Sequence, residues 1–305
     1  MHGATTRSLI LLWVTTACGT APPVPADTGI PEEPDAETDT TSEALVDCAG
    51  DIAGDVPSFY QDFFACVDAS MTGEDVILGT DGLPPHPSPY YAQDHPLYVE
   101  FNTRGGTHYR NPNQLAEQRF SFVIPVDPVP KGIDITAALV DNTMMTSDEE
   151  FGGGPQGIAL DGVLIFAAMA APGDDLWAEQ FTFDLYEGHP AGTAYHYHFE
   201  TPGPLEVLQH RGFTSTATPG DAEVELYGMM CDGTVVMGCT ELDGTPPSGT
   251  DFDAQNGHVH DIGEGSTTHF SGRYHTHVCP DVWTDHPFFP EIAFYEQTNC
   301  PAARP

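Results

Sequence analysis

The sequence predicts a mostly β fold: an antiparallel domain, sandwich-like or irregular, with few short helices and stabilised by disulfides. The 305 residues include 31 Gly and 28 Pro, which favours short strands and turns over long helices. Short runs of alternating or β-branched residues recur between Gly, Pro and Asp clusters. No alternation of helices with strands is visible, so a doubly wound α/β sheet is not expected.

The first 18 residues have the pattern of a secretory signal. Arg7 precedes a short apolar run, residues 9–14, and small residues follow it. The stretch TTAC resembles the lipobox of bacterial lipoproteins, with Thr15 where that motif usually has Leu. The resemblance implies that Cys18 carries the lipid as the mature N-terminus; the alternative is cleavage nearby, with Cys18 a free thiol. We therefore expect an exported protein with a lipid anchor in a bacterial membrane, on the periplasmic or cell-surface face of the outer membrane.

Two segments separate this signal from the main domain. Residues 19–46 are rich in Pro, Thr, Asp and Glu and lack aromatic residues, which predicts a disordered tether. Residues 47–84 are expected to form a short helical cap, because Phe59, Phe63 and Val67 follow one another at intervals of four.

The main β domain is expected over residues 85–302. Strands are predicted at residues 97–103, 119–126, 157–166, 180–186, 222–228 and 234–238. Asp161-Gly162 and Asp232-Gly233 have the composition of tight hairpin turns.

The charge balance is strongly acidic, with 46 Asp and Glu against 8 Lys and Arg, a formal net charge of −38. Nucleic-acid binding requires clustered basic residues that displace counterions from phosphates. No Lys or Arg occurs between Arg7 and Arg104, and no basic cluster occurs elsewhere. We therefore expect no nucleic-acid partner. The sequence identifies no protein partner.

Seven cysteines leave six for disulfides once Cys18 is assigned to the lipid anchor. Sequence proximity suggests the pairs Cys48–Cys66, Cys231–Cys239 and Cys279–Cys300, although six cysteines allow about 15 pairings. The absence of C-x-x-C argues against a zinc ribbon or a thioredoxin-like site.

One motif occurs twice in the main domain. Residues 183–198 and 252–277 both read F-D-x-x-x-G-H, then a loop, then Y-H-x-H. Because residues i and i+2 of a strand point to the same face, His196 and His198 share one face and Tyr195 and Tyr197 the other. The second copy pairs His275 with His277 in the same way. Two such strands side by side would present four imidazoles.

The duplication predicts a transition-metal site. The candidate ligands are His189, His196, His198, His258, His275 and His277. His189 and His258 follow glycines and are expected on turns that complete one cluster with the two H-x-H pairs. Imidazole ligands favour copper or zinc, with iron as a further option. The competing interpretation is that such histidines serve packing and hydrogen bonding.

Further polar residues near the two motifs are candidates for supporting roles. Asp184 and Asp253 fit as additional ligands, as acceptors that hold an imidazole N–H, or as turn residues. The other candidates for the surroundings of the site are Tyr195, Tyr274, His260 and His269.

At Tyr195-His196-Tyr197-His198 the sequence resembles the YHYH-domain family. The stretches RFSFVIP, GGPQGIALDGVLIF, FDLYEGHP, CDGTVVMG and NGH with YHTH are similar to further blocks of that family, in the same order over residues 97–300. Thr276 stands where many members have Tyr, and Thr234 and Val235 replace the usual Phe and Pro. The resemblance implies an exported domain in which the histidine blocks are central, and implies no particular reaction.

Three functions are compatible with these patterns. The first is a lipid-anchored, exported protein that binds a transition metal through the duplicated histidines. The second is a metal-dependent enzyme, either oxidoreductase or hydrolase, with an open coordination position. The third is a non-catalytic surface interaction module whose histidines are structural.

Overall fold

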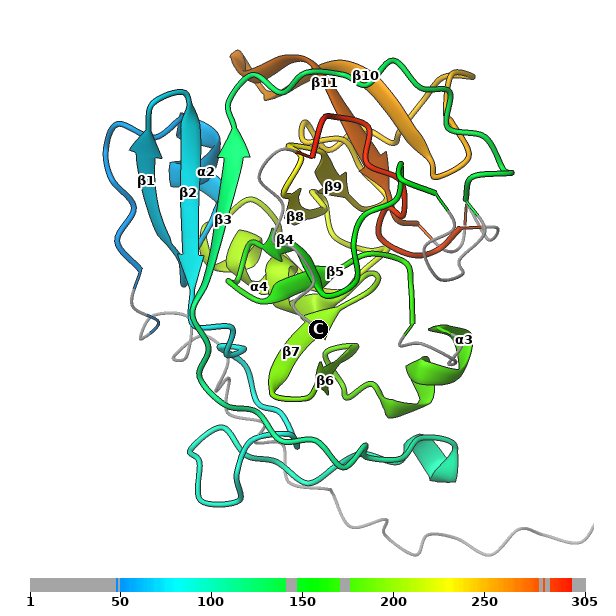
Figure 1. Cartoon of the computed structure of the whole chain (residues 1–305). Helices are drawn as coiled ribbons and strands as arrows, with labels where there is room; N and C mark the ends of the chain where they lie inside the picture. The colour runs from blue at the N-terminus through cyan, green and yellow to red at the C-terminus, as the bar shows by residue number, and fades with distance from the viewer. Residues whose placement is uncertain are drawn as a thin grey trace, which may run out of the picture. The chain divides into compact units, whose positions relative to one another are not determined.

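Two β-sheets organise the part of the chain that the computed structural model describes, namely residues 48, 50–140, 147–170, 176–279, 282 and 286–297 (Figure 1). One sheet has three strands and the other eight. This agrees with the predicted mostly β fold with few short helices. The predicted signal peptide, Cys18, the whole of the tether, and Cys300 lie outside the described residues.

The three-stranded sheet follows the helix α2, Ser58–Phe63. Its strands, in the order β1-β2-β3, are β1 (Asp68–Thr72), β2 (Asp75–Thr80) and β3 (Phe120–Pro125). Alternate residues of β2 are buried, as expected for a strand with one face against the core. The segment 47–84 therefore contains the predicted short helix and also a hairpin that the sequence analysis did not predict.

The eight-stranded sheet has the order β10-β11-β9-β8-β4-β5-β7-β6. Its strands are β4 (Pro155–Ala159), β5 (Leu164–Phe166), β6 (Gly188–Ala191), β7 (Ala194–Tyr197), β8 (Leu226–Met230), β9 (Val235–Met237), β10 (Gly257–Glu264) and β11 (Thr267–His277). Five neighbouring pairs are antiparallel, whereas β5–β7 and β9–β11 are parallel.

The large sheet consists of two units with the same strand order. From the centre outward, the first unit runs β4-β5-β7-β6 and the second β8-β9-β11-β10. The central pair β4–β8 aligns Ile158 with Met229, flanked symmetrically by Gly157 opposite Met230 and Ala159 opposite Gly228. The duplication is therefore larger than the repeated histidine motif: each unit is a hairpin followed by the motif, and the two units meet about a local two-fold axis.

A three-residue loop closes the inner hairpin of each unit. Gly162 and Gly233 have φ values of 80° and 97°, which a glycine adopts without the Cβ penalty. Ala159 N–H donates to the Val163 carbonyl at 2.8 Å, and Met230 N–H donates to the Thr234 carbonyl at 2.8 Å. The hairpins predicted at Asp161-Gly162 and Asp232-Gly233 are confirmed.

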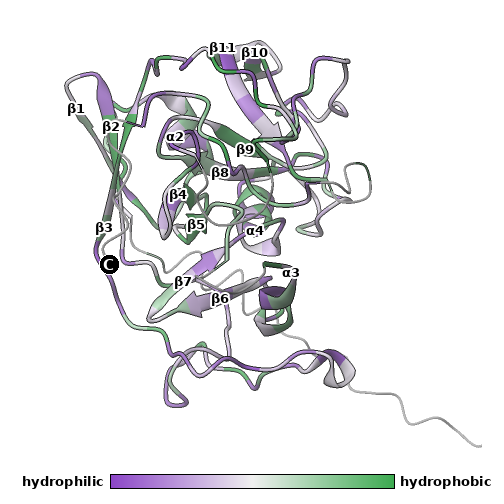
Figure 2. Ribbon diagram, turned by 45° about the vertical axis from the view of Figure 1, so that its right-hand side comes forward, coloured by the Kyte–Doolittle hydropathy of each residue, from purple (hydrophilic) through white to green (hydrophobic). Residues whose placement is uncertain are grey.

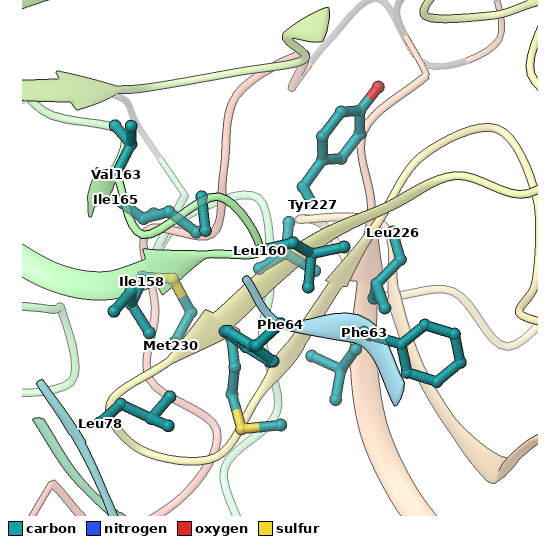
Figure 3. Close-up of a cluster of buried hydrophobic side chains, with 14 of the residues drawn as sticks. Phe63, Phe64, Leu78, Ile158, Leu160, Val163, Ile165, Leu226, Tyr227 and Met230 are labelled. Atoms are coloured by element: carbon teal, nitrogen blue, oxygen red, sulfur yellow. The ribbon is translucent and has the colours of Figure 1, made fainter. Parts of the chain in front are cut away.

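The core lies where α2 and the small sheet pack against the central strands (Figure 3). Phe63, Leu78, Ile158 and Met230 come from these four elements and are fully buried. Every residue of β8 and β9 is buried. Figure 2 shows these strands as hydrophobic, whereas hydrophilic stretches interrupt β7 and β11, where the histidines lie.

Two predicted strands are absent from the described residues. Residues 97–103 make only a single bridge, Ser88 to Tyr98, because no neighbouring strand is available to pair with them. Residues 180–186 begin with the 3-10 turn η2 (Gln180–Thr182), which follows the short helix α3 (Leu176–Glu179). A further 3-10 turn, η1, spans Arg104–Gly106.

The longest helix among the described residues, α4 (Pro202–His210), was not predicted. Its start signal is nevertheless present in the sequence. The Thr201 hydroxyl accepts a hydrogen bond from Gly203 N–H, and Pro202 occupies the first helical turn, where its missing N–H costs nothing.

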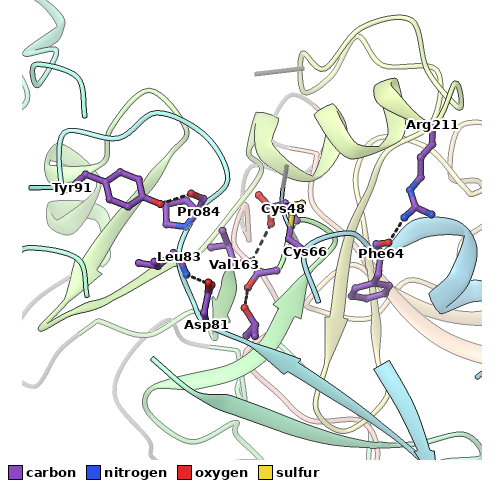
Figure 4. Close-up of a disulfide and its surroundings, with 12 residues drawn as sticks. Cys48, Phe64, Cys66, Asp81, Leu83, Pro84, Tyr91, Val163 and Arg211 are labelled. Atoms are coloured by element: carbon purple, nitrogen blue, oxygen red, sulfur yellow. Dashed lines mark hydrogen bonds between the residues drawn. A yellow bond between two sulfur atoms is a disulfide. The ribbon is translucent and has the colours of Figure 1, made fainter. Parts of the chain in front are cut away.

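One disulfide joins Cys48 to Cys66 (Figure 4), and another joins Cys239 to Cys279. The first pair was expected. The expected pairs Cys231–Cys239 and Cys279–Cys300 are wrong, because the parallel pairing of β9 with β11 brings Cys239 next to Cys279. Cys231 is also disulfide-bonded. Within the described ranges, no helix has the length and apolar character needed to cross a membrane.

Candidate metal centres

The histidines of the two motifs gather on the outermost hairpins of the large sheet. In the hairpin β6–β7, His189 lies directly opposite His196, and in β10–β11 His258 lies opposite His275. Opposite residues of an antiparallel pair project to the same face of the sheet. His189 and His258 are therefore on strands and not on the turns that we expected, and their side chains reach the H-x-H pairs directly.

The first centre is formed by His189, His196 and His198. Their ligand-capable atoms all lie within 4.8 Å of one another, and all three side chains are buried. The Nε2 atom of His196 is 3.1 Å from that of His189 and 2.9 Å from that of His198. Three nitrogens on a tetrahedral ion would lie about 3.3 Å apart at bond lengths of about 2.0–2.1 Å. The three nitrogens therefore have nearly the spacing of a ligand set.

The other ring nitrogen of each of these histidines already has an acceptor. Nδ1 of His198 lies 3.0 Å from the Ala167 carbonyl oxygen, and Nδ1 of His196 lies 3.2 Å from that of Ala194. Since a carbonyl can only accept, Nδ1 carries the proton in both rings.

Nδ1 of His189 also has an acceptor, which is the hydroxyl oxygen of Thr182. Thr182 Oγ1 donates to the Glu179 carbonyl at 2.8 Å, so its oxygen is available to accept from His189 Nδ1 at 2.5 Å. Three Nε2 lone pairs consequently face one another without a proton between them in the neutral cluster. A cation placed among them would remove this repulsion.

The second centre is formed by His258, His275, His277 and Glu241, whose ligand-capable atoms also lie within 4.8 Å of one another. The Oε1 atom of Glu241 is 3.3 Å from Nε2 of both His258 and His277. Its Oε2 atom is 3.2 Å from Nε2 of His275. The carboxylate thus faces all three imidazoles.

The ring orientations of the second centre match those of the first. Nδ1 of His275 lies 3.1 Å from the Arg273 carbonyl oxygen, and Nδ1 of His277 lies 2.9 Å from that of Gly238. His275 Nε2 and Glu241 Oε2 are buried without a hydrogen-bond partner. Burying such atoms unsatisfied is costly, and a shared metal ion would satisfy both.

Burial keeps the three histidines of the first centre, and His275 of the second, neutral. It lowers the pKa of His196 well below its usual value, and the neighbouring His189 and His198 lower it further. Burial also lowers the pKa of His275, to about 4, although Glu241 opposes the shift. Neutral imidazole is the form that binds a metal, so these four histidines are ready for an ion at neutral pH.

The tyrosines and aspartates of the repeated motif lie on the opposite face. Tyr195 donates from its hydroxyl to Asp184 at 2.7 Å, and Tyr274 donates to Asp253 at 2.7 Å. Both aspartates also accept backbone N–H groups of their own loops. These four residues fix the strands from behind the centres. Among their hydrogen bonds in the structure, Asp184 and Asp253 make none to an imidazole.

A glycine permits this arrangement in each unit. A Cβ atom at Gly188 would fall 2.5 Å from the ring of Tyr195, and one at Gly257 would overlap the hydroxyl of Tyr274. The F-D-x-x-x-G-H motif therefore contains its glycine because the tyrosine of the opposite strand passes over that position.

The two remaining histidine candidates differ in position. His260 lies two residues after His258 on β10, and its Nε2 is 3.1 Å from Glu241 Oε1. His269 lies elsewhere, with Nδ1 2.9 Å from the Ser58 hydroxyl and its ring against Phe59 and Phe63 of α2.

The expectation of one cluster from both motifs is not met: the structure forms two separate centres. The H-x-H strands β7 and β11 have four strands between them in the sheet. Each H-x-H pair is completed by the histidine of its own unit. Glu241, which lies 11 positions before Phe252 in a loop, was not among the predicted ligands. No spacing rule connects this residue to the motif. The sequence does contain a further H-x-H, His258 and His260, which indicates that these two histidines share one face of a strand.

Comparisons of this chain with protein-family models, with curated proteins and with solved structures found no match.

Proposed function

We propose that this chain is a metal-binding protein that holds a transition-metal ion in each of its two buried centres. The observation that carries this proposal is the orientation of the imidazoles. Nδ1 of His196, His198, His275 and His277 lies at a backbone carbonyl, and Nε2 of each points into a buried cluster. A neutral histidine that only stabilises a core would donate from one ring nitrogen to an acceptor and accept a hydrogen bond from a donor at the other.

The donor sets favour particular ions. Three imidazoles suit copper or zinc, and a carboxylate beside three imidazoles also suits iron. Cysteines contribute no ligand in this proposal, because those near the second centre are joined as Cys239–Cys279.

We also propose that the chain acts outside the cytoplasm, anchored by a lipid at Cys18. The two disulfides among the described residues are typical of proteins from oxidising compartments, which agrees with this localisation. On the basis of its YHYH and YHTH motifs, we propose that it is a member of the YHYH-domain family.

Metal analysis of the purified chain tests the proposal. We expect two equivalents of zinc or copper per chain, lost on dialysis against a chelator and regained from added salt. His196→Ala and His275→Ala should each retain one equivalent, and the double variant none. His210→Ala, at an exposed position on α4, is the matched control and should retain two.

Thermal unfolding distinguishes this function from that of a module with structural histidines. Binding to the native state alone raises the melting temperature with metal concentration. We expect this rise for the wild type and no rise for the double variant. A wild-type chain that binds no added metal and melts at the same temperature with and without it contradicts the proposal.

A further inference from the structure

The two centres have the same architecture but different surroundings at two positions. The first difference is the acidic residue. Glu241 faces all three imidazoles of the second centre at 3.2–3.3 Å. In the first centre, Glu179 Oε2 lies 3.8 Å from Nε2 of His189 and 3.9 Å from Nε2 of His198. On a tetrahedral ion with bonds of about 2.0–2.2 Å, ligand atoms would be about 3.3–3.4 Å apart. Glu241 meets this spacing, whereas Glu179 stands about half an ångström outside it.

The second difference is a histidine. His258 and His260 lie two residues apart on β10 and thus on one face of the sheet. His260 is therefore beside the second centre. Its ring centroid is 4.5 Å from that of His258 and 4.4 Å from that of His275. The position equivalent to His260 in the first unit is Ala191 on β6, whose side chain has no donor atom. The second centre is therefore better supplied with protein ligands than the first.

Glu179 is the most exposed of the polar side chains around the first centre. Phe166 stacks on His196 at 3.7 Å, and Phe183 packs edge-on against His189 at 4.7 Å, so aromatic rings cover the centre elsewhere. The Glu179 side chain is 16% exposed, against 7% for His189 and 1% for His198. The side of Glu179 is therefore the side on which the centre lies nearest to solvent. The hydrogen bond from Thr182 to the Glu179 carbonyl ties this segment to the centre.

We propose that the first centre keeps a coordination position for an exogenous small ligand on the side of Glu179, whereas the second is saturated by Glu241 and its histidines. The inference rests on the proposed metal binding. Three protein ligands with one open position are typical of zinc sites that exchange or activate a ligand, and four are typical of structural sites. The natural ligand is a neutral, protic oxygen donor, of which water is the simplest. The Glu179 carboxylate accepts its hydrogen bond and disfavours an anion at the same position.

Cobalt substitution of the purified full chain tests this inference, with azide as the probe. The visible absorption of bound Co²⁺ reports its coordination. Azide should change the spectrum of His275→Gln, which retains the first centre, and leave that of His196→Gln, which retains the second, unaltered. In the wild type loaded with two cobalt ions, one azide should bind per chain.

The matched pair Glu179→Gln and Glu241→Gln tests the roles of the two acids without removing a histidine. Glu179→Gln removes a negative charge beside the open position, so we expect it to bind cobalt at the first centre and to bind azide about tenfold more tightly. Glu241→Gln removes a ligand, so its second centre should lose cobalt affinity and open to azide.

The outcomes separate this inference from the proposed function. If cobalt binds at both centres but azide changes neither or both spectra equally, the inference is wrong and metal binding stands. Azide affinity unaltered by Glu179→Gln also contradicts it. If cobalt binds at neither centre in the folded wild type, the proposed function fails first.

Discussion

Single side chains behind the centres determine how firmly the ligands are held. The hydroxyl of Tyr197, between His196 and His198, donates to Asp161 at 2.9 Å and lies 2.8 Å from Nε2 of His86. All of these side chains are buried. The ligand strand is therefore supported by a polar network on the face that carries no ligand. Removing one member leaves a buried polar partner unsatisfied, which typically costs about 1–3 kcal/mol.

His86 is expected to make stability depend on pH. Burial lowers its pKa to about 3, opposed by a backbone hydrogen bond to Pro87. Between about pH 3 and 6.5 the unfolded chain therefore binds one proton more than the native chain at this residue. Its contribution to stability is complete above pH 6.5 and decreases as the pH falls, by up to about 1.4 kcal/mol per pH unit.

Urea unfolding of the metal-free chain at several pH values checks this prediction. His86→Gln should have a smaller dependence of the unfolding free energy on pH between 4 and 6 than the wild type. Burial raises the pKa of Asp161 and of Asp184 to about 6, which acts in the opposite direction in both proteins. The difference between variant and wild type isolates His86, and equal slopes would contradict the assignment.

At the level of elements, the disulfide Cys239–Cys279 is part of the second centre. Cys239 follows Gly238, whose carbonyl oxygen fixes Nδ1 of His277, and Cys279 lies two residues after His277. The bridge therefore ties the end of β9 to the end of the ligand strand β11. The other bridge, Cys48–Cys66, lies near α2.

Replacing each bridge by a pair of serines separates stability from metal binding. The Cys239–Cys279 loop spans 40 residues, so its loss should lower the unfolding free energy by about 4 kcal/mol. The same change should weaken zinc at the second centre and leave the first unaltered. Loss of Cys48–Cys66, with a separation of 18 residues, should cost about 3 kcal/mol and change neither affinity. Urea unfolding and zinc titration measure both effects, and equal affinities in the two variants would contradict the role given to Cys239–Cys279.

Local patterns predicted the parts of this fold that depend on neighbouring residues. The Asp-Gly turns and the alternation of His196 and His198 depend on residues within about five positions, and all could be read directly. The run at 97–103 alternates equally well but has no strand to pair with, which no local pattern reveals. Conversely, Thr201 and Pro202 are a local signal for the start of a helix, yet α4 was not predicted.

For the candidate site, the sequence indicated the six histidines but not their grouping. Grouping depends on strand order, and β7 and β11 lie in different units of the sheet. Glu241 reaches the second centre from a loop, so its role depends on tertiary structure. Residues 183–198 and 252–277 were recognised as copies. The similarity of the hairpins around Gly162 and Gly233, which reveals the full repeat, was not used.

At the scale of the whole described molecule, the central pair β4–β8 joins two similar halves. Its register is symmetric about Ile158 and Met229, as in the contact of two identical subunits. Each half contains one centre, so the halves can diverge in chemistry while the shared core maintains the fold. The differences at Glu179 and Glu241, and at Ala191 and His260, are of this kind.

Both centres lie on hairpins at the two ends of the sheet. This position affects the rate at which metal ions enter and leave. An outer hairpin can separate from the sheet while β4 and β8 remain paired, because outer elements open at lower free energy than the core. We therefore expect ions to enter and leave by local opening of β6–β7 or β10–β11, on a timescale shorter than that of global unfolding. Amide hydrogen exchange would show bound zinc slowing the amides of these hairpins and leaving those of β8 unchanged. Metal release no faster than global unfolding would contradict this route.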